Sequence, residues 1–209
     1  MKTNCRNYYF ILVGMPPRNV LKPGEQELFI LGVESPKEMF LCTSDQFDYY
    51  SDVMNNMISD AAEKAPAVSD VKVGDMVIVY SEELHYRAVV LELMKDGNIK
   101  VEMIDLANEK DVPMAQLKKA DATLFKLPML AVKCSLDSWV NKDAKETVAA
   151  AEHLKSLMDV YDKVTVNVKE STGDITKVTI PSIEEKLAKK LNPTSMARAN
   201  LLKLKMKKT

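Results

Sequence analysis

The chain has 209 residues, which is enough for one large domain or two small ones with a sizeable core. Hydrophobic residues make up 46% of it and charged residues 28%, an ordinary balance for a globular protein. The formal net charge of −1 excludes a chain that is basic throughout and binds nucleic acid by charge alone. The apolar run at residues 8–13 is too short for a signal sequence, or for the roughly 20 residues of a membrane span.

Charge is unevenly placed along the chain. Residues 196–209 contain five basic side chains and no acidic one, so the residues before them carry a net charge of −6. An acidic body suits a basic partner better than it suits a phosphate backbone.

The sequence shows no pattern of catalytic or metal-binding residues. Three cysteines, Cys5, Cys42 and Cys134, are far apart and odd in number, which favours ordinary thiols in a reducing compartment. There is no glycine-rich phosphate loop, no HExxH and no nucleophile elbow. His85, beside Tyr86 at a turn, is interpreted as a packing residue rather than a general base. We therefore expect a cytoplasmic protein that is not an enzyme and that needs no cofactor and no metal.

The first 64 residues show strand patterns followed by a helix pattern. Apolar runs rich in strand formers predict strands at 8–13, 27–33 and 39–43, with proline and glycine turns between the first two. From residue 44 to residue 64, apolar side chains recur at steps of three and four. This spacing predicts a long helix whose wide apolar face packs on two neighbours.

Between residues 71 and 125 the apolar period is two. Strands are predicted at 75–80, 85–93, 98–104 and 109–112, and Asp96-Gly97 is the strongest hairpin signal among their turns. Four or five short antiparallel strands in about 55 residues predict a small, strongly bent β-barrel.

Strand and helix patterns return after this segment. A strand at 129–136, a helix at 143–159, a hairpin of 163–169 with 175–180, and a helix starting near Pro181 are predicted.

Neither end of the chain has enough strands for a stable sheet, so both ends are expected to pair into one lobe. The predicted layout has four parts: a lobe of 8–43 plus 128–192, a linker helix at 44–66, a barrel at 70–125 and a basic tail at 193–209.

The segment from Gly74 to Asn108 resembles the core of a Tudor domain. His85-Tyr86-Arg87-Ala88 is similar to the aromatic-Tyr-Arg-Ala strand of that family, and Ile104-Asp105-Leu106-Ala107-Asn108 is similar to its Ile-Asp-Tyr-Gly-Asn motif. The flanks resemble the extended form of the family, in which a long helix joins the Tudor barrel to a staphylococcal-nuclease-like, OB-type lobe around it. The resemblance covers residues 8–192 and implies an α+β fold that is mainly β.

The resemblance also implies where a ligand would bind. In the family, a cage of ring faces holds methylated arginine by cation–π attraction and apolar contact, at about 0.5–2 kcal/mol per good contact. The cage positions fall on Tyr80, Tyr86, Met103, Leu106 and Asn108. Met103 and Leu106 are not aromatic, whereas the other three match the family. An alternative hypothesis is that these side chains only cap the end of the barrel.

Two missing rings are expected to remove most of the preference for methylated arginine. Met103 can pack against a methyl group, but it has no quadrupole that attracts a cation. Arg87 and Asp105 stand where the family pairs arginine with aspartate, and this pair is implied to position the cage loops. Five acidic side chains around those loops would attract a basic peptide: Glu82, Glu83, Asp105, Glu109 and Asp111.

The implied function is that of a non-catalytic scaffold module that binds an arginine-containing peptide. The implied partner is the N-terminal tail of a Piwi-clade Argonaute, in piRNA-guided silencing at perinuclear germline granules (nuage). Binding is expected not to require arginine methylation.

Other hypotheses stay open. The chain could read symmetric dimethylarginine with its degenerate cage, or associate with itself through Met54 and Met57. It could also bind single-stranded RNA through the OB-type lobe and the basic tail, although the aromatic residues of that lobe fall inside apolar runs: Tyr9, Phe10, Phe29 and Phe40. A nuclease would follow only from the resemblance of the lobe, and the acidic and arginine side chains that it needs are not found.

Overall fold

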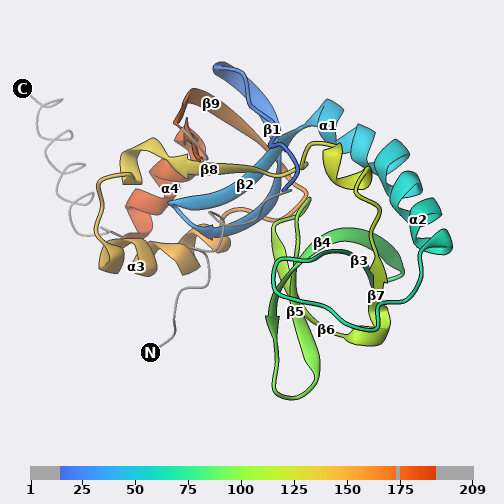
Figure 1. Cartoon of the computed structure of the whole chain (residues 1–209). Helices are drawn as coiled ribbons and strands as arrows, with labels where there is room; N and C mark the ends of the chain where they lie inside the picture. The colour runs from blue at the N-terminus through green and yellow to red at the C-terminus, as the bar shows by residue number, and fades with distance from the viewer. Residues whose placement is uncertain (1–14, 173–174, 192–209) are drawn as a thin grey trace, which may run out of the picture. The chain divides into compact units, whose positions relative to one another are not determined.

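The computed structural model describes residues 15–172 and 175–191 (Figure 1). The predicted strand at 8–13 and the tail at 193–209 lie outside these residues. Within them the chain forms two compact units, one from residues 15–19 and 45–131, the other from residues 20–44 and 132–191.

The second unit is built on a closed five-stranded barrel with the ladder order β1-β2-β8-β10-β9. Its strands are β1 (Gly24–Ser35), β2 (Glu38–Thr43), β8 (Val132–Leu136), β9 (Lys163–Thr172) and β10 (Ile175–Thr179). All neighbours are antiparallel except β8 and β10, which run parallel. Strands from the two ends of the chain therefore share one sheet.

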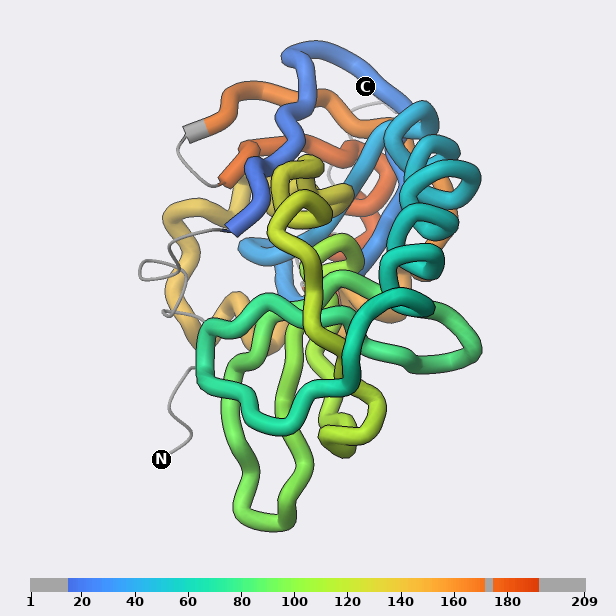
Figure 2. Tube along the Cα trace, turned by 45° about the vertical axis from the view of Figure 1, so that its right-hand side comes forward, coloured from blue at the N-terminus to red at the C-terminus, as the bar shows by residue number. Residues whose placement is uncertain are grey.

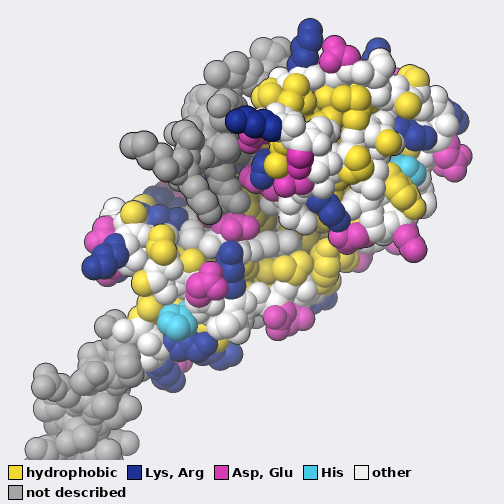
Figure 3. Space-filling model, turned by 90° about the horizontal axis from the view of Figure 1, so that it is seen from below, with side chains coloured by type: hydrophobic (Ala, Val, Ile, Leu, Met, Phe, Trp, Pro, Cys, Tyr) yellow, Lys and Arg dark blue, Asp and Glu magenta, His cyan; other side chains and the backbone are white. Residues whose placement is uncertain are grey.

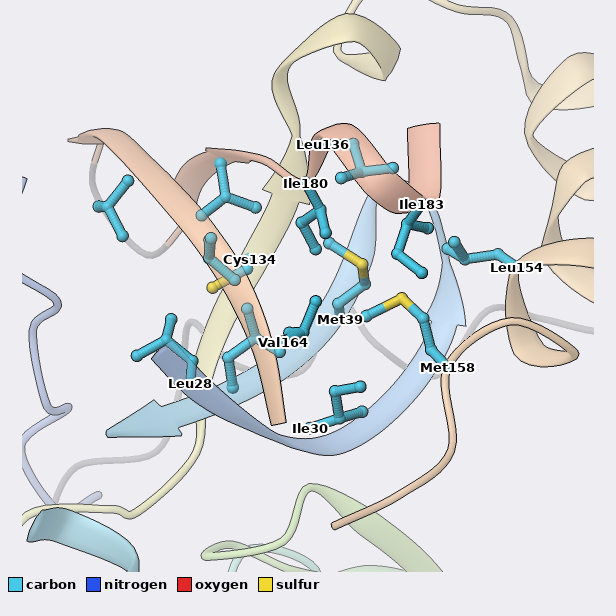
Figure 4. Packing of buried hydrophobic residues seen from close by; sticks show 14 of the residues in the cluster. Leu28, Ile30, Met39, Cys134, Leu136, Leu154, Met158, Val164, Ile180 and Ile183 are labelled. Carbon is cyan, nitrogen blue, oxygen red and sulfur yellow. The ribbon is translucent and has the colours of Figure 1, made fainter. Parts of the chain in front are cut away.

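The interior of this barrel is filled by aliphatic side chains that point toward one another (Figure 4). Leu28 and Met39 are fully buried, and Leu154 of α3 (Ala144–Lys155) and Ile183 of α4 (Pro181–Leu191) complete the same cluster. Each such side chain contributes about 1.5–3 kcal/mol through the apolar surface that it removes from water. The barrel and its two helices are thus one hydrophobic core.

The helix predicted at 143–159 starts as expected and ends earlier. At its start, the Asp143 carboxylate accepts a hydrogen bond from the Glu146 amide at 2.7 Å, which satisfies one free N–H of the first turn. The helix stops at Lys155 because residues 161 and 162 exchange backbone hydrogen bonds with Ile30 of β1, at 2.7 and 2.9 Å. The apolar spacing in the sequence extends to Met158, beyond the end of the helix, because that side chain also packs in the core.

The first unit contains a five-stranded antiparallel sheet in the order β6-β5-β4-β3-β7. Its strands are β3 (Met76–Ser81), β4 (Leu84–Leu93), β5 (Asn98–Met103), β6 (Asn108–Pro113) and β7 (Leu117–Lys119). The sheet curls around one apolar cluster, and a bulge in β4 after Val90 adds to the bend (Figure 1). The mainly β, α+β fold class is confirmed. The three-residue β7 was not predicted, because it is too short to show a period.

The predicted helix at 44–64 is present, with a change of pitch in its middle. It consists of α1 (Ser44–Tyr49), a π-helical turn η2 (Tyr50–Met54) and α2 (Asn55–Lys64). The Asn55 amide donates to the Tyr50 carbonyl, five residues back. Ile58 and Ala62 are fully buried, and the Lys118 ammonium donates to the Ala62 carbonyl at 2.7 Å. The chain that follows β7 returns alongside this helix (Figure 2).

Candidate functional site

Arg87 of β4 is fully buried, and a buried charge needs a partner. Its Nε and Nη2 atoms donate to the two carboxylate oxygens of Asp105 at 2.9 and 2.6 Å. The Asp105 side chain is also buried, so this bidentate pair is held away from water.

The other N–H groups of Arg87 hold a returning segment of backbone. They donate to the carbonyls of Leu124 (2.6 Å), Leu127 (2.8 Å) and Pro128 (2.9 Å), so all five donors of the guanidinium have acceptors. Asp105 accepts a further bond from the Leu130 amide at 3.1 Å. The ion pair therefore fixes the loop after β5 against residues 124–130.

Three of the four ring positions of the predicted cage lie in the core of the sheet. Tyr86 is 9% exposed and Met103 is 3% exposed, and both belong to the apolar cluster of the first unit. Leu106 is half-buried and packs against the same cluster. The structure thus brings these three side chains together as packed apolar surface.

Tyr80 is placed differently. The ladder pairs Val79 with Tyr86 and Tyr80 with His85, and neighbours along a strand point to opposite faces. The side chains of Tyr80 and Tyr86 therefore leave opposite faces of the β3–β4 hairpin. Tyr80 is 44% exposed, and its ring centroid lies 5.1 Å from that of His85.

His85 lies beside Tyr80, next to basic and acidic neighbours. Burial lowers the pKa of His85, and the positive charge of Lys118 lowers it further, against an opposing effect of Glu63. The imidazole is therefore neutral at pH 7 and can offer its ring face to Tyr80.

Asn108 is exposed at the start of β6 and is the ladder partner of Met103. It follows Ala107, whose φ of 52° lies in the left-handed region. Glycine adopts this conformation without steric cost, and the resemblance places a glycine here. Ala107 adopts this conformation although it is not a glycine.

The acidic side chains around these loops are mostly paired with lysines. Glu82 lies 2.5 Å from Lys110, and Glu109 and Asp111 lie 3.9 and 3.5 Å from Lys100. The face shown in Figure 3 likewise carries both signs of charge interspersed.

The sequence predicts the acidic side chains around these loops, but not the lysines that pair with them. The strand register could have revealed one of them, since Lys100 stands directly opposite Asp111. Asp105 is paired with Arg87, and among the five acidic residues only Glu83 makes no ion pair with a described residue. The negative charge left for a basic partner is therefore smaller than the number of acidic residues indicates.

The structure also places the cysteines, the aromatic residues of the second unit, and Met54 and Met57. Burial raises the pKa of Cys42 to about 12 and also raises that of Cys134, which leaves both thiols protonated. Phe40 is buried, and the Lys163 ammonium lies 5.0 Å from the Phe29 ring centroid. Met54 is buried, whereas Met57 is 41% exposed.

Residues 15–172 and 175–191 contain no cluster of three or more histidine, cysteine, aspartate or glutamate side chains that could hold a metal ion. In the same residues, no helix is long and apolar enough to span a membrane.

Comparison with known proteins places this geometry in a family. The family model of the Tudor domain matches residues 21–138, more than half of the chain. Tudor domain-containing 6-like protein of Xenopus laevis is 23% identical over 171 residues, which cover 78% of this chain and 8% of that protein. The chain spans between 5% and 24% of the lengths of the curated relatives that it matches.

Solved structures share the fold. The extended Tudor domain TD3 of mouse TDRD1, in complex with a MILI peptide that contains dimethylarginine, superposes with a TM-score of 0.64. The match has 22% identity and covers 80% of this chain and 87% of that one. A structure of Tudor in complex with Aubergine also gives a TM-score of 0.64, with 23% identity over 78% of this chain and 98% of that one. The chain therefore belongs to the Tudor domain family, a family of non-catalytic binding modules, and its fold is that of an extended Tudor domain.

Proposed function

We propose that this module binds an arginine-containing segment of a partner protein at the cage positions, without requiring methylation of the arginine. The proposed partner is the arginine-rich N-terminal tail of a Piwi-clade Argonaute. The MILI and Aubergine complexes of related extended Tudor domains support this choice. The proposed setting is the cytoplasm, in germline granules where such scaffolds act in piRNA-guided silencing.

The observation that carries the proposal is the burial of Met103 and the packing of Leu106 at two ring positions. A methylated guanidinium gains from ring faces because its methyl groups reduce its hydration and its charge is attracted by the ring quadrupole. Packed aliphatic side chains offer no quadrupole. The exposed ring of Tyr80 can stack on a guanidinium with or without methyl groups.

Calorimetric titration with one arginine-rich Piwi-tail peptide, unmethylated and symmetrically dimethylated, tests the proposal. We expect the unmethylated peptide to bind as tightly as the dimethylated one or more tightly. A tenfold preference for the dimethylated peptide, about 1.4 kcal/mol, would contradict the role given to Met103 and Leu106. Absence of binding by either peptide would reject the proposed partner.

A gain-of-function variant sharpens this test. Leu106→Tyr restores one ring at a half-buried position and is expected to shift the preference toward the dimethylated peptide by about threefold or more. Leu93→Tyr is the matched control, since Leu93 is 50% exposed at the far end of β4 and is not a cage position. An equal shift in both variants would show that the added ring acts without the cage.

A further inference from the structure

A second concave site lies in the first unit, between its long helix and the segment that returns after β7. It has a volume of about 360 Å³. Tyr49, Tyr50 and Met54 of the helix form one wall, and Leu127, Pro128 and Leu130 form the other. None of the cage positions lines this site, so it is a separate pocket.

The π-helical turn η2 explains how this pocket comes to be lined by aromatic residues. A π turn inserts an extra residue, so the side chains before it and after it are rotated relative to an unbroken α-helix. Tyr49 precedes the turn and Met54 ends it, yet both line the same pocket. Tyr49 is 48% exposed, which leaves one ring open to a ligand.

The charge at the pocket has a single sign. Asp45 is exposed, lines the pocket and lies one helical turn before Tyr49. No lysine or arginine is among the lining residues, and the described residues make no ion pair with Asp45. A carboxylate thus stands beside an open tyrosine ring over apolar walls.

Hydrogen bonds connect one wall of the pocket to the cage loop, which contains Asp105 and Leu106. Leu127 and Pro128 are held by the Arg87 guanidinium, and Leu130 by the Asp105 carboxylate. Asp105 immediately precedes Leu106, a cage position. One buried ion pair therefore fixes both one wall of the pocket and the loop of the candidate peptide site.

We propose that this pocket binds the side chain of a second arginine of the same partner segment. A guanidinium is planar and weakly hydrated, so it can stack on the Tyr49 ring while it donates two hydrogen bonds to Asp45. The aliphatic stem would lie against Met54 and Leu127. This inference rests on the proposed function for the identity of the partner segment, but the pocket can be tested without that partner.

The probe is Nα-acetyl-arginine amide, with Nα-acetyl-citrulline amide as the uncharged analogue of nearly the same shape. Both are titrated into the 209-residue chain and followed by amide chemical shifts in NMR spectra. We expect the arginine probe to bind with a dissociation constant on the order of 1–10 mM, as befits a ligand of this size. The shifted amides should be those of residues 45–54 and 127–130.

Two charge variants separate the pocket from general electrostatics. Asp45→Asn is expected to weaken binding of the arginine probe about three- to fivefold. Asp48→Asn is the matched control, because it removes the same charge from an exposed position of the same helix that does not line the pocket, and it should leave binding unchanged. Tyr49→Ala should weaken binding as well, and since Tyr49 is half exposed this variant is expected to fold.

The outcomes are distinct from those of the peptide titration. The inference is overturned if the arginine probe shifts no amide of residues 45–54, if citrulline binds equally well, or if both aspartate variants lose affinity equally. Binding of a Piwi-tail peptide at the cage loop with no shift in residues 45–54 overturns the pocket alone. Probe binding in the pocket without any peptide binding sustains the arginine pocket and rejects the proposed partner.

Discussion

At the scale of single residues, Arg87 shows how one buried charge organises the first unit. Its five donors are shared between one carboxylate and three backbone carbonyls, all within 2.6–2.9 Å. A lysine has three donors on a point charge and cannot reproduce this planar fork. The arginine is therefore required by geometry as much as by charge.

Replacing Arg87 with lysine is expected to lower the free energy of unfolding by about 3–5 kcal/mol, because it leaves Asp105 and several carbonyls without full partners in a buried site. Urea unfolding followed by circular dichroism measures the change. Glu185→Gln, which breaks the exposed pair with Lys189, is the control and should leave the urea midpoint unchanged. A small effect of the lysine variant would mean that water enters the site and replaces the lost donors.

At the scale of elements, the β3–β4 hairpin turns on two non-glycine residues in the left-handed region. Glu82 has a φ of 51° and Glu83 a φ of 67°. Two consecutive positive φ values define a type I′ turn, whose twist matches that of the flanking strands and which usually carries asparagine and glycine. The ion pair of Glu82 with Lys110 across the sheet offsets part of the strain at the first position.

Glu83→Gly is expected to stabilise the protein by about 0.5–1 kcal/mol, because glycine removes the steric cost of the left-handed conformation. Thermal unfolding would show a higher midpoint. The opposite sign is expected for Ala149→Gly in the middle of α3, where glycine costs about 1 kcal/mol of helix propensity. A loss of stability in both variants would indicate that the turn is not left-handed in solution.

At the scale of the whole molecule, the closed barrel depends on both ends of the chain. The β1–β2 hairpin pairs with β8 and β9, which lie more than 80 residues further along the chain. Its inward side chains, such as Leu28 and Leu41, are fully buried only when those strands are present. A two-stranded hairpin alone is at best marginally stable in water.

A fragment of residues 1–131 is therefore expected to expose the apolar face of β1 and β2. We expect it to bind the dye ANS and to self-associate on size-exclusion chromatography, whereas the 209-residue chain does neither. Adding a second fragment of residues 132–209 should reduce dye binding, because β8, β9 and β10 can complete the barrel. A monomeric first fragment that binds no dye would contradict the dependence of the hairpin on the distant strands.

The sequence by itself determined the elements and the family. Periods of two and of three to four residues are local, so they located nine of the ten strands and the helices, and Asp96-Gly97 marked a turn in which Gly97 has a φ of 89°. The motif around Tyr86-Arg87 in β4 and the motif around Asp105 just after β5 indicated the Tudor family, because each motif is a short run of consecutive residues. The short β7 was missed, β1 begins three residues earlier than predicted and β8 begins three residues later.

Only the tertiary structure decided what the candidate site presents to a partner. The burial of Tyr86 and Met103 depends on the other strands that curl around them, and the sequence pattern treats a buried tyrosine and an exposed one alike. The lysines that pair with Glu82, Glu109 and Asp111 come from other strands of the sheet, so the arrangement of the strands sets the charge of the rim. The pocket beside Tyr49 requires a π-helical turn and a backbone segment that returns from residues 127–130, held there by Arg87. Such contacts join residues far apart in sequence, and their strength is fixed by packing, which no local pattern records.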